Sequence, residues 1–377
     1  MKKVLHTTTV LTGVAVIGLS AVPAEAQQKA KNLQLSVGGY FNSYVAISEQ
    51  SSSFENDTAS SGLESGYDQF NIYNDSEIHF TGSTKLDNGI GVSVTVELET
   101  DQVKNADAHI DDSYLSLTGS FGDVRIGSTD AITGVFANSA PAAGATGPND
   151  GDLGNSIIQP SAVSATADTL LGTGNSMKLT YLTPEIAGFQ AGFSYEPSST
   201  NSDAMPAVGG TSGTDTQQYN IGIAYAGKLG STDVSADLSY REDHGTAANS
   251  TSGIRGGVNL TAGQITIGGS FKKIDAIDSG IEGTANSPEE EGFDVGIQYG
   301  MGPTTLSLTY LQSDMPLASG TTGDDSVEAL TIGASYTIGP GIEFLGTAAR
   351  VEYSDESTND ANNNDGWAVI GGIGIKF

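Results

Sequence analysis

Few residues of this chain have types and spacings that could support chemistry, and the first candidates are acidic turns. Asn149-Asp150-Gly151-Asp152 sets several oxygen ligands on one tight turn, which suits Ca2+ because hard cations prefer oxygen. An acidic turn in solvent explains the same residues, and we prefer that interpretation. The segment 360–366 (DANNNDG) also suggests calcium, but Asp365 stands where EF-hand spacing requires glycine. We therefore expect no cofactor, with Ca2+ at Asp150 and Asp152 as the alternative.

His79 is the other candidate, because it follows Glu77 by two residues and shares its polar phase. A catalytic or metal-binding histidine would need partners, and the only other histidines beyond residue 26 are His109 and His244, in or near expected loops. We interpret His79 as a titrating histidine on a polar wall. The 50 glycines form no phosphate-binding fingerprint, and neither a nucleophile motif nor a paired carboxylate has a suitable context. We expect a protein that is not an enzyme.

The N-terminus has the features of a cleaved secretory signal. Two lysines precede an apolar run over residues 10–22, and Ala24-Glu25-Ala26 supplies the small-x-small pattern for cleavage before Gln27. The run is shorter than the roughly 20 residues that a membrane-crossing helix needs. We expect residues 1–26 to be removed during Sec-type export and residues 27–377 to form one domain.

Charge and cysteine content narrow the possible partners. The chain has 15 Lys and Arg against 45 Asp and Glu, a net charge of −30, and no cysteine. Nucleic acid is excluded as a partner because phosphate backbones attract basic surfaces. Without cysteine, an exported protein cannot rely on disulfides for its stability.

Alternation with a period of two runs along the whole chain and indicates β-strands with one apolar and one polar face. Between residues 90 and 99, Ile, Val and Leu occupy one phase and Gly, Ser, Thr and Glu the other. The same pattern recurs at 219–225, 234–241, 254–260, 293–299 and 330–338. No helical period fits these segments.

Short and long connections take turns along the chain. The tight turns carry the Gly, Asn and Pro that hairpins require, and they fall at 87–89, 120–122, 186–188, 229–231, 262–263, 302–303 and 339–341. Longer polar stretches lie near 49–66, 102–109, 130–175, 197–215, 244–250, 276–290, 315–325 and 355–365. These fifteen connections separate about sixteen strands, expected at 31–48, 68–86, 90–101, 110–119, 122–129, 176–184, 188–196, 216–228, 231–243, 251–262, 264–275, 291–301, 303–314, 326–338, 341–354 and 366–377.

This layout predicts an all-β fold, a transmembrane antiparallel β-barrel of about 16 strands. Strands of about ten residues with dyad alternation and unequal connections are typical of such barrels, whose closure leaves no unpaired edge in hydrocarbon. About eight strands leave a lumen that side chains fill, whereas 16–18 leave an aqueous channel. Glu97, Glu99, Asp237 and Asp294 fall in the polar phase, and we expect them to be lumen acids.

Three segments resemble the general porin family of Gram-negative bacteria, in its alphaproteobacterial form. Lys85–Gly91 (KLDNGIG) is similar to that family's turn between the second and third strands, and Tyr114–Gly127 (YLSLTGSFGDVRIG) to its fourth strand, turn and fifth strand. The terminal Gly374–Phe377 (GIKF) resembles its closing strand, whose final aromatic, here Phe377, is read by the outer-membrane insertion machinery. The resemblance implies a homotrimer of 16-stranded barrels, each with its third long loop folded into the lumen.

That loop corresponds to residues 130–175, and the resemblance implies that it narrows the pore. The Pro-Glu-Phe-Gly-Gly tip of well-known members is absent, and only four arginines occur in the chain. Opposed charges across a narrow aqueous gap would produce a transverse field. The expected constriction sets wall residues against loop residues: Lys85, Arg125 and Lys178 against Asp130, Asp150, Asp152 and Asp168.

We therefore expect an outer-membrane porin that lets ions and small hydrophilic solutes diffuse passively, with a weak preference for cations. A barrel with a dedicated substrate, such as a sugar or phosphate, is one alternative. A secreted all-β adhesin is another, although its inward positions should be apolar. The expected partners are the lipid bilayer, lipopolysaccharide, two further copies of the chain and the insertion machinery.

Overall fold

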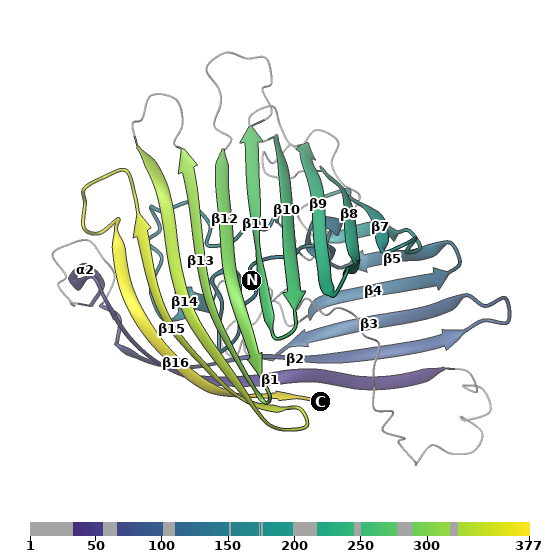
Figure 1. Cartoon of the computed structure of the whole chain (residues 1–377). Helices are drawn as coiled ribbons and strands as arrows, with labels where there is room; N and C mark the ends of the chain where they lie inside the picture. The colour runs from purple at the N-terminus through teal and green to yellow at the C-terminus, as the bar shows by residue number, and fades with distance from the viewer. Residues whose placement is uncertain are drawn as a thin grey trace.

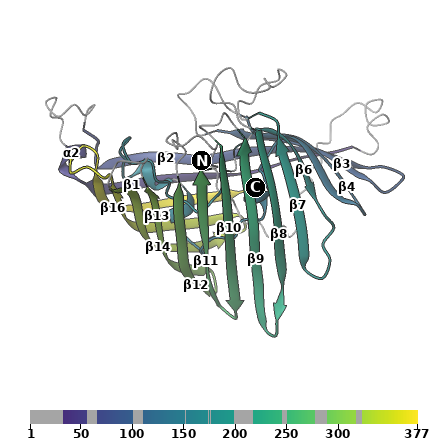
Figure 2. The ribbon, with the colours of Figure 1, turned by 90° about the horizontal axis from the view of Figure 1, so that it is seen from above.

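The structure is a computed structural model that describes residues 33–55, 66–100, 110–150, 152–172, 174, 176–198, 217–244, 250–276, 289–316 and 323–377. In these residues sixteen antiparallel strands pair in sequence order, and the last pairs with the first, so that the sheet closes into a barrel. Figures 1 and 2 show this wall from two directions. The predicted signal at 1–26 lies outside the described residues.

The strand bounds follow those expected from the alternation. The strands are β1 (Gln34–Gln50), β2 (Phe70–Lys85), β3 (Gly91–Glu99), β4 (Ile110–Gly119), β5 (Gly122–Ser128), β6 (Met177–Leu182), β7 (Phe189–Glu196), β8 (Gln217–Leu229), β9 (Thr232–His244), β10 (Thr251–Ala262), β11 (Ile265–Ala276), β12 (Glu290–Met301), β13 (Thr304–Pro316), β14 (Asp324–Gly339), β15 (Ile342–Ser354) and β16 (Asn364–Lys376). The prediction of a 16-stranded antiparallel barrel is confirmed.

Alternating burial identifies the two faces of the wall. Val295 and Ile332 are 49% and 58% exposed, whereas their neighbours Asp294 and Thr331 are 3% and 1% exposed. An exposed apolar band would be costly in water, at about 25 cal/mol per Å², and hydrocarbon removes that cost. The outward phase is therefore the lipid-facing surface, and the inward phase faces the lumen.

Helical structure is short in the described residues. It consists of α2 (Ser52–Glu55), α3 (Ile132–Val135) and the 3-10 turns η1 (Pro148–Asp150) and η2 (Asp152–Asn155). No helix in this part of the chain is long and apolar enough to cross a membrane.

The predicted tight turns lie together at one end of the barrel. Gly89, Gly230 and Gly302 have φ of 86°, 64° and 61°, the left-handed region that glycine adopts without steric cost. At 186–188 both Ala187 and Gly188 have a positive φ, 52° and 85°. The seven hairpins therefore form where the Gly, Asn and Pro clusters predict them.

The barrel closes at its terminal strand. The amide of Gly39 donates to the carbonyl oxygen of Phe377 at 3.0 Å, and the Phe377 amide donates to Gly39 at 3.1 Å. From there β1 and β16 pair continuously up to Gln50 and Gly366. The last residue of the chain thus completes the seam.

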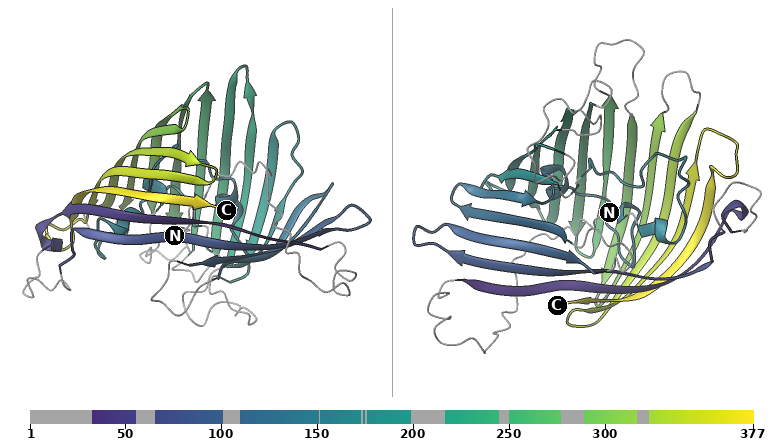
Figure 3. Two further views of the ribbon diagram at one scale, coloured as in Figure 1. Left: turned by 90° about the horizontal axis from the view of Figure 1, so that it is seen from below. Right: turned by 180° about the vertical axis from the view of Figure 1, so that it is seen from behind.

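The segment 129–176 between β5 and β6 is named here the inner loop, and its described residues lie inside the barrel (Figure 3). The largest buried apolar cluster lies between this loop and the wall. Leu153, Ile157 and Val163 from the loop contact an apolar lumen surface that comprises Tyr44, Leu311, Val327, Val351 and Ile370. Here the structure differs from the sequence-based expectation, because the lumen face of β13–β16 and β1 is apolar where the loop covers it.

Candidate functional site

Glycines line the wall where the outgoing arm of the inner loop, residues 131–147, crosses it. A Cβ at these positions would overlap or crowd loop atoms, namely Ile132 at Gly192 and Gly222, the Asn138 carbonyl at Gly257, Ala140 at Gly296, and the Ala143 carbonyl at Gly333. These five glycines belong to β7, β8, β10, β12 and β14. They form a shallow track that lets the loop backbone approach the sheet.

Polar side chains of the wall accept hydrogen bonds from backbone N–H groups of the same arm. The Asn138 N–H donates to Asp237 Oδ1 at 2.7 Å, and the Ala140 N–H donates to Asp294 Oδ1 at 3.0 Å. Similar bonds run from Ile132 to Ser194, from Ala143 to Ser307 and from Ala145 to Thr347, at 2.9–3.0 Å. Buried amides need acceptors, so this arm is fixed although it has little secondary structure of its own.

A buried ion pair joins both arms of the loop to the wall. Arg255 Nη1 lies 2.5 Å from Asp237 Oδ2, and neither side chain is exposed. The same guanidinium donates to the carbonyl oxygens of Asn138 at 2.8 Å and Thr169 at 3.2 Å. Asn138 belongs to the outgoing arm and Thr169 to the returning arm, the part of the loop that follows η2, so Arg255 holds the two arms at a common point.

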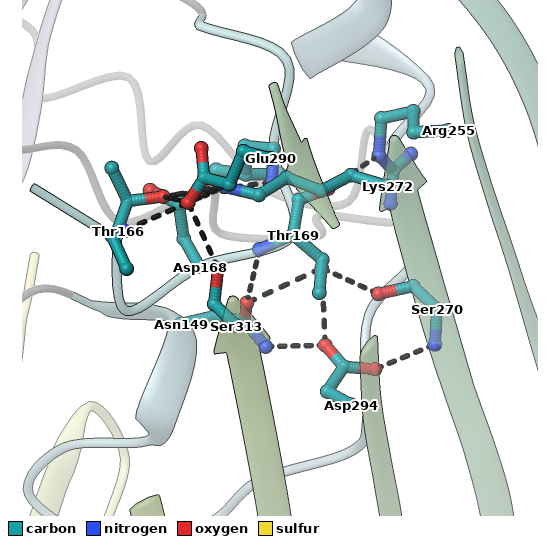
Figure 4. Close-up of polar contacts among 12 residues, drawn as sticks. Asn149, Thr166, Asp168, Thr169, Arg255, Ser270, Lys272, Glu290, Asp294 and Ser313 are labelled. Carbon is teal, nitrogen blue, oxygen red and sulfur yellow. Dashed lines mark hydrogen bonds and ion pairs between the residues drawn. The ribbon is translucent and has the colours of Figure 1, made fainter. Parts of the chain in front are cut away.

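A second buried charge holds the returning arm, as Figure 4 shows. Lys272 Nζ lies 3.1 Å from both Asp168 Oδ1 and Glu290 Oε1, and it also contacts the Thr166 hydroxyl. Glu290 accepts the Thr166 amide at 2.8 Å and the Ser313 hydroxyl at 2.8 Å. The lysine is therefore compensated by two carboxylates, one from the loop and one from the wall.

Asp294 connects the two arms below this cluster (Figure 4). Its Oδ2 accepts hydrogen bonds from Asn149 and from the Thr169 hydroxyl, the latter at 3.2 Å. The Thr169 hydroxyl also lies 2.5 Å from Ser270 Oγ. Asp237 and Asp294 do occupy the lumen phase, but the loop covers them, so they bind the loop instead of facing water. They are acids of the lumen phase, as the alternation predicts, and their carboxylates face the loop.

Lys178 has a similar covered position at the base of the loop. Its side chain is fully buried, 3.5 Å from Glu196, and it donates to the carbonyls of Thr129 and Gly174 at 2.7 Å each. Thr129 and Gly174 stand at the two ends of the loop. Lys178 therefore closes the base of the loop. The sequence-based expectation placed it at the aqueous pore, which it does not reach.

Acidic side chains gather on a different part of the wall, on the neighbouring strands β2 and β3. Tyr40 Oη donates to Asp75 and Glu77 at 3.0 Å each, and His79 Nε2 lies 2.7 Å from Glu77. In the strand register His79 is opposite Glu97, and Glu77 is opposite Glu99. We name Asp75, Glu77, Glu97 and Glu99 the acidic wall. The loop contacts described above are made instead to β6–β16 and β1.

The other predicted constriction residues lie at several places along the wall and the loop. Arg125 pairs with Asp123 at 2.8 Å and lies over the ring of Tyr114 at 5.6 Å. Lys85 ends β2, six residues from His79, which places it about 20 Å further along the strand. Asp130 is half-buried at the start of the loop. The side chains of Asp150 and Asp152 are outside the part that the structure describes. The alternative of a Ca2+ site at these two residues is therefore not tested.

Sequence reasoning missed the residues that hold the loop. Arg255, Lys272 and Glu290 are buried charges in the lumen phase of strands that face the loop. In the sequence each is a charged residue in the polar phase beside small residues. A lumen face exposed to water has the same pattern, so the sequence does not distinguish the two. The glycine track has the same ambiguity, because glycine is frequent throughout the strands.

A closed transmembrane wall with a loop folded against its lumen face defines a porin-type channel. The chain belongs to the Gram-negative porin family, whose model matches residues 11–356. A monosaccharide porin from Halomonas sp. and the major outer membrane protein of Halomonas elongata are each 23% identical to it over 97% of this chain and 85% of the relative.

Solved structures show the same fold. The anion-selective porin from Comamonas acidovorans has a TM-score of 0.61 at 17% identity, with 92% of this chain and 100% of that one covered. The trimer form of OmpT from Vibrio cholerae has a TM-score of 0.57 at 12% identity, with 91% and 99% covered. The protein is therefore an outer-membrane channel for solute diffusion, in a family of channels that are not enzymes. A secreted adhesin is set aside.

Proposed function

We propose that the channel passes ions and small hydrophilic solutes with a weak preference for cations. The observation that carries this proposal is the acidic wall. Ligand atoms of Glu77, His79 and Glu97 lie within 4.8 Å of one another, and Asp75 shares the Tyr40 hydroxyl with Glu77. Carboxylate groups that line a pore raise the local concentration of cations and lower that of anions.

Apart from Lys85, which lies about 20 Å from His79 along β2, the basic residues described beside the lumen offset this field little. Lys178, Arg255 and Lys272 are buried against the loop with carboxylate partners. Arg125 is half-buried and paired with Asp123. Opposed charges in contact largely cancel at a distance, so the acidic wall determines the sign of the potential that a permeating ion meets.

A barrel with a sugar-type substrate is the second candidate. The Tyr40 hydroxyl and the carboxylates beside it are hydrogen-bonding groups of the kind that sugar hydroxyls bind, and one relative is named a monosaccharide porin. Competition of sugars with ion current would support this reading. Unaltered current at saturating sugar would favour the general diffusion channel.

The expected assembly is a homotrimer in the outer membrane. A trimer form among the structural neighbours and the exposed apolar surface of the barrel support it. Phe377, which completes the seam, is proposed as the residue that the insertion machinery reads. Contact of the acidic external loops with lipopolysaccharide through divalent ions also remains a proposal.

Planar-bilayer recording tests the proposed function. Purified, folded protein should give stepwise conductance, and a tenfold KCl gradient should give a reversal potential of the sign for K+ over Cl−. A reversal potential of the opposite sign would overturn the cation preference. Folded protein without conductance would overturn diffusion of ions.

A further inference from the structure

The connection between β15 and β16, drawn in yellow at the left of Figure 1, is shaped by its own side chains. Asp355 Oδ2 accepts the Ser357 hydroxyl at 2.6 Å and the Asn362 amide group at 2.7 Å. The Asp355 amide donates to Asn363 Oδ1 at 2.9 Å. These bonds fix the backbone at residues 355 and 356 and hold the Asp355 carboxylate in one orientation.

A buried carboxylate from the neighbouring strand reaches the same point. Asp325, near the start of β14, is only 1% exposed. Its Oδ2 accepts the amide of Ser164 in the inner loop at 2.7 Å. Its Oδ1 is buried and has no hydrogen-bond partner among the described residues. A buried carboxylate oxygen without a donor is costly, and either a bound cation or a proton shared with the nearby Asp355 would remove that cost.

Three carboxylates converge there. Ligand oxygens of Asp325, Asp355 and Glu356 lie within 4.8 Å of one another. Oxygens that share one Ca2+ at 2.3–2.6 Å are separated by at most about 5 Å, so the spacing is compatible with a single ion. Burial falls from Asp325 through Asp355 to the exposed Glu356, which leaves the outer side open to water ligands and to entry of the ion.

The donor set identifies the class of ion. All three ligands are carboxylates, without the imidazole or thiolate that zinc sites use. Mg2+ demands near-ideal octahedral geometry at short distances, whereas Ca2+ accepts irregular sites with carboxylates and waters. A set of three carboxylates whose outer side is open to water therefore fits Ca2+ better.

We propose that Asp325, Asp355 and Glu356 bind Ca2+ at the loop end of the barrel. The ion joins the β15–β16 connection to β14, and through Ser164 it supports the returning arm of the inner loop. The site is distinct from Asp150 and Asp152. It also differs from the 360–366 segment, where Asn362 and Asn363 orient the loop backbone and Asp355 without being ligands.

Titration calorimetry on EDTA-washed, folded protein in detergent, with CaCl2 as titrant, tests the site. Saturable binding of one Ca2+ per chain is expected, and Asp325→Asn and Glu356→Gln should each weaken it at least about tenfold, the scale on which even outer-shell changes weaken metal sites. Asp360→Asn is the matched control, since its exposed carboxylate lies in the same loop outside the cluster and should leave binding unchanged.

Folding is checked independently by the heat-modifiable mobility of the barrel. Glu356 is exposed, so its conversion to Gln removes a ligand without disturbing a buried contact. Absence of saturable binding by the wild type would overturn the site, as would equal affinity of Glu356→Gln and the wild type. Replacement of CaCl2 by MgCl2 should give weaker binding, and tighter binding of Mg2+ would overturn the choice of ion.

Discussion

Arg255 and Asp237 form an ion pair at 2.5 Å in which both side chains are fully shielded from solvent. Asp237 also accepts the Asn138 amide at 2.7 Å, and Arg255 donates to the Asn138 carbonyl at 2.8 Å. One residue of the inner loop is thus held by both members of the pair. The position of the loop therefore depends on charges that have no access to water.

Removal of Asp237 should strongly destabilise the barrel. Asp237→Ala leaves the Arg255 charge buried without its partner, and breaking such a pair costs about 3–5 kcal/mol. The midpoint of urea unfolding in vesicles measures the effect. Asp233→Ala is the control, because its pair with Lys228 is 56–67% exposed and should contribute at most about 1 kcal/mol. Equal losses in the two variants would contradict the prediction.

Joint replacement of the pair should recover much of that stability. Asp237→Leu with Arg255→Met removes both charges and keeps apolar volume, a change that is often neutral or stabilising in buried pairs. We expect the double variant to unfold at a higher urea concentration than Asp237→Ala. A double variant no more stable than Asp237→Ala would show that the hydrogen bonds to the loop, and not the unpaired charge, dominate the cost.

Neutralisation of Lys272 should destabilise the returning arm. Lys272→Met leaves Glu290, with 4% of its side chain exposed, and Asp168 beside each other without the ammonium between them. A loss of about 3–5 kcal/mol is expected from the unpaired charges. Lys273→Met is a matched control, because the Lys273 side chain points outward, is 47% exposed and pairs with the exposed acids Asp275 and Glu291. Comparable unfolding midpoints of the two variants would contradict the role given to Lys272.

Addition of a methyl group to the glycine track should narrow the pore. Gly257→Ala places a Cβ on the carbonyl oxygen of Asn138, so the outgoing arm must move away from the wall and toward the lumen. We expect a lower single-channel conductance with the trace still stepwise. Gly82→Ala is the control, since nothing lies within 4 Å of its Cβ position. Unchanged conductance in Gly257→Ala would mean that the arm does not border the permeation path.

The wall of the barrel could be predicted from the sequence because its physical signals are local. Alternation at residues 90–99 reports the two faces directly, and the glycines at 89, 230 and 302 mark turns that require a positive φ. Each hairpin also fixes the register of its neighbour. The strand count and the closed topology follow from the repetition of these local rules.

The path of the inner loop could not be predicted, because its contacts join residues far apart in sequence. Asp237 and Glu97 have the same alternation signature, yet the loop covers one and the acidic wall contains the other. Lys178 is similar: its phase indicates the lumen, but only the loop ends at 129 and 174 explain its burial. The alternation phase of a residue shows which face of the wall it lies on. It does not show whether water or the inner loop lies against that face.

Charge removal on the acidic wall should reduce the preference for cations. A carboxylate about 4 Å from the ion path lowers the energy of a cation by about 1 kcal/mol in water, so its removal can lower cation permeability by up to about fivefold, while anion permeability rises. Glu77→Gln and Glu97→Gln should each lower the ratio of cation to anion permeability, and the pair should lower it further. The measurement is the reversal potential in a KCl gradient, repeated in 1 M salt, where screening within about 3 Å should weaken the difference.

Glu352→Gln is the control for this prediction. It removes the same charge from the outward face, where the side chain is 51% exposed, and should leave the ratio of cation to anion permeability unchanged. If Glu352→Gln alters the ratio as much as Glu77→Gln, the preference reflects net charge and not the acidic wall.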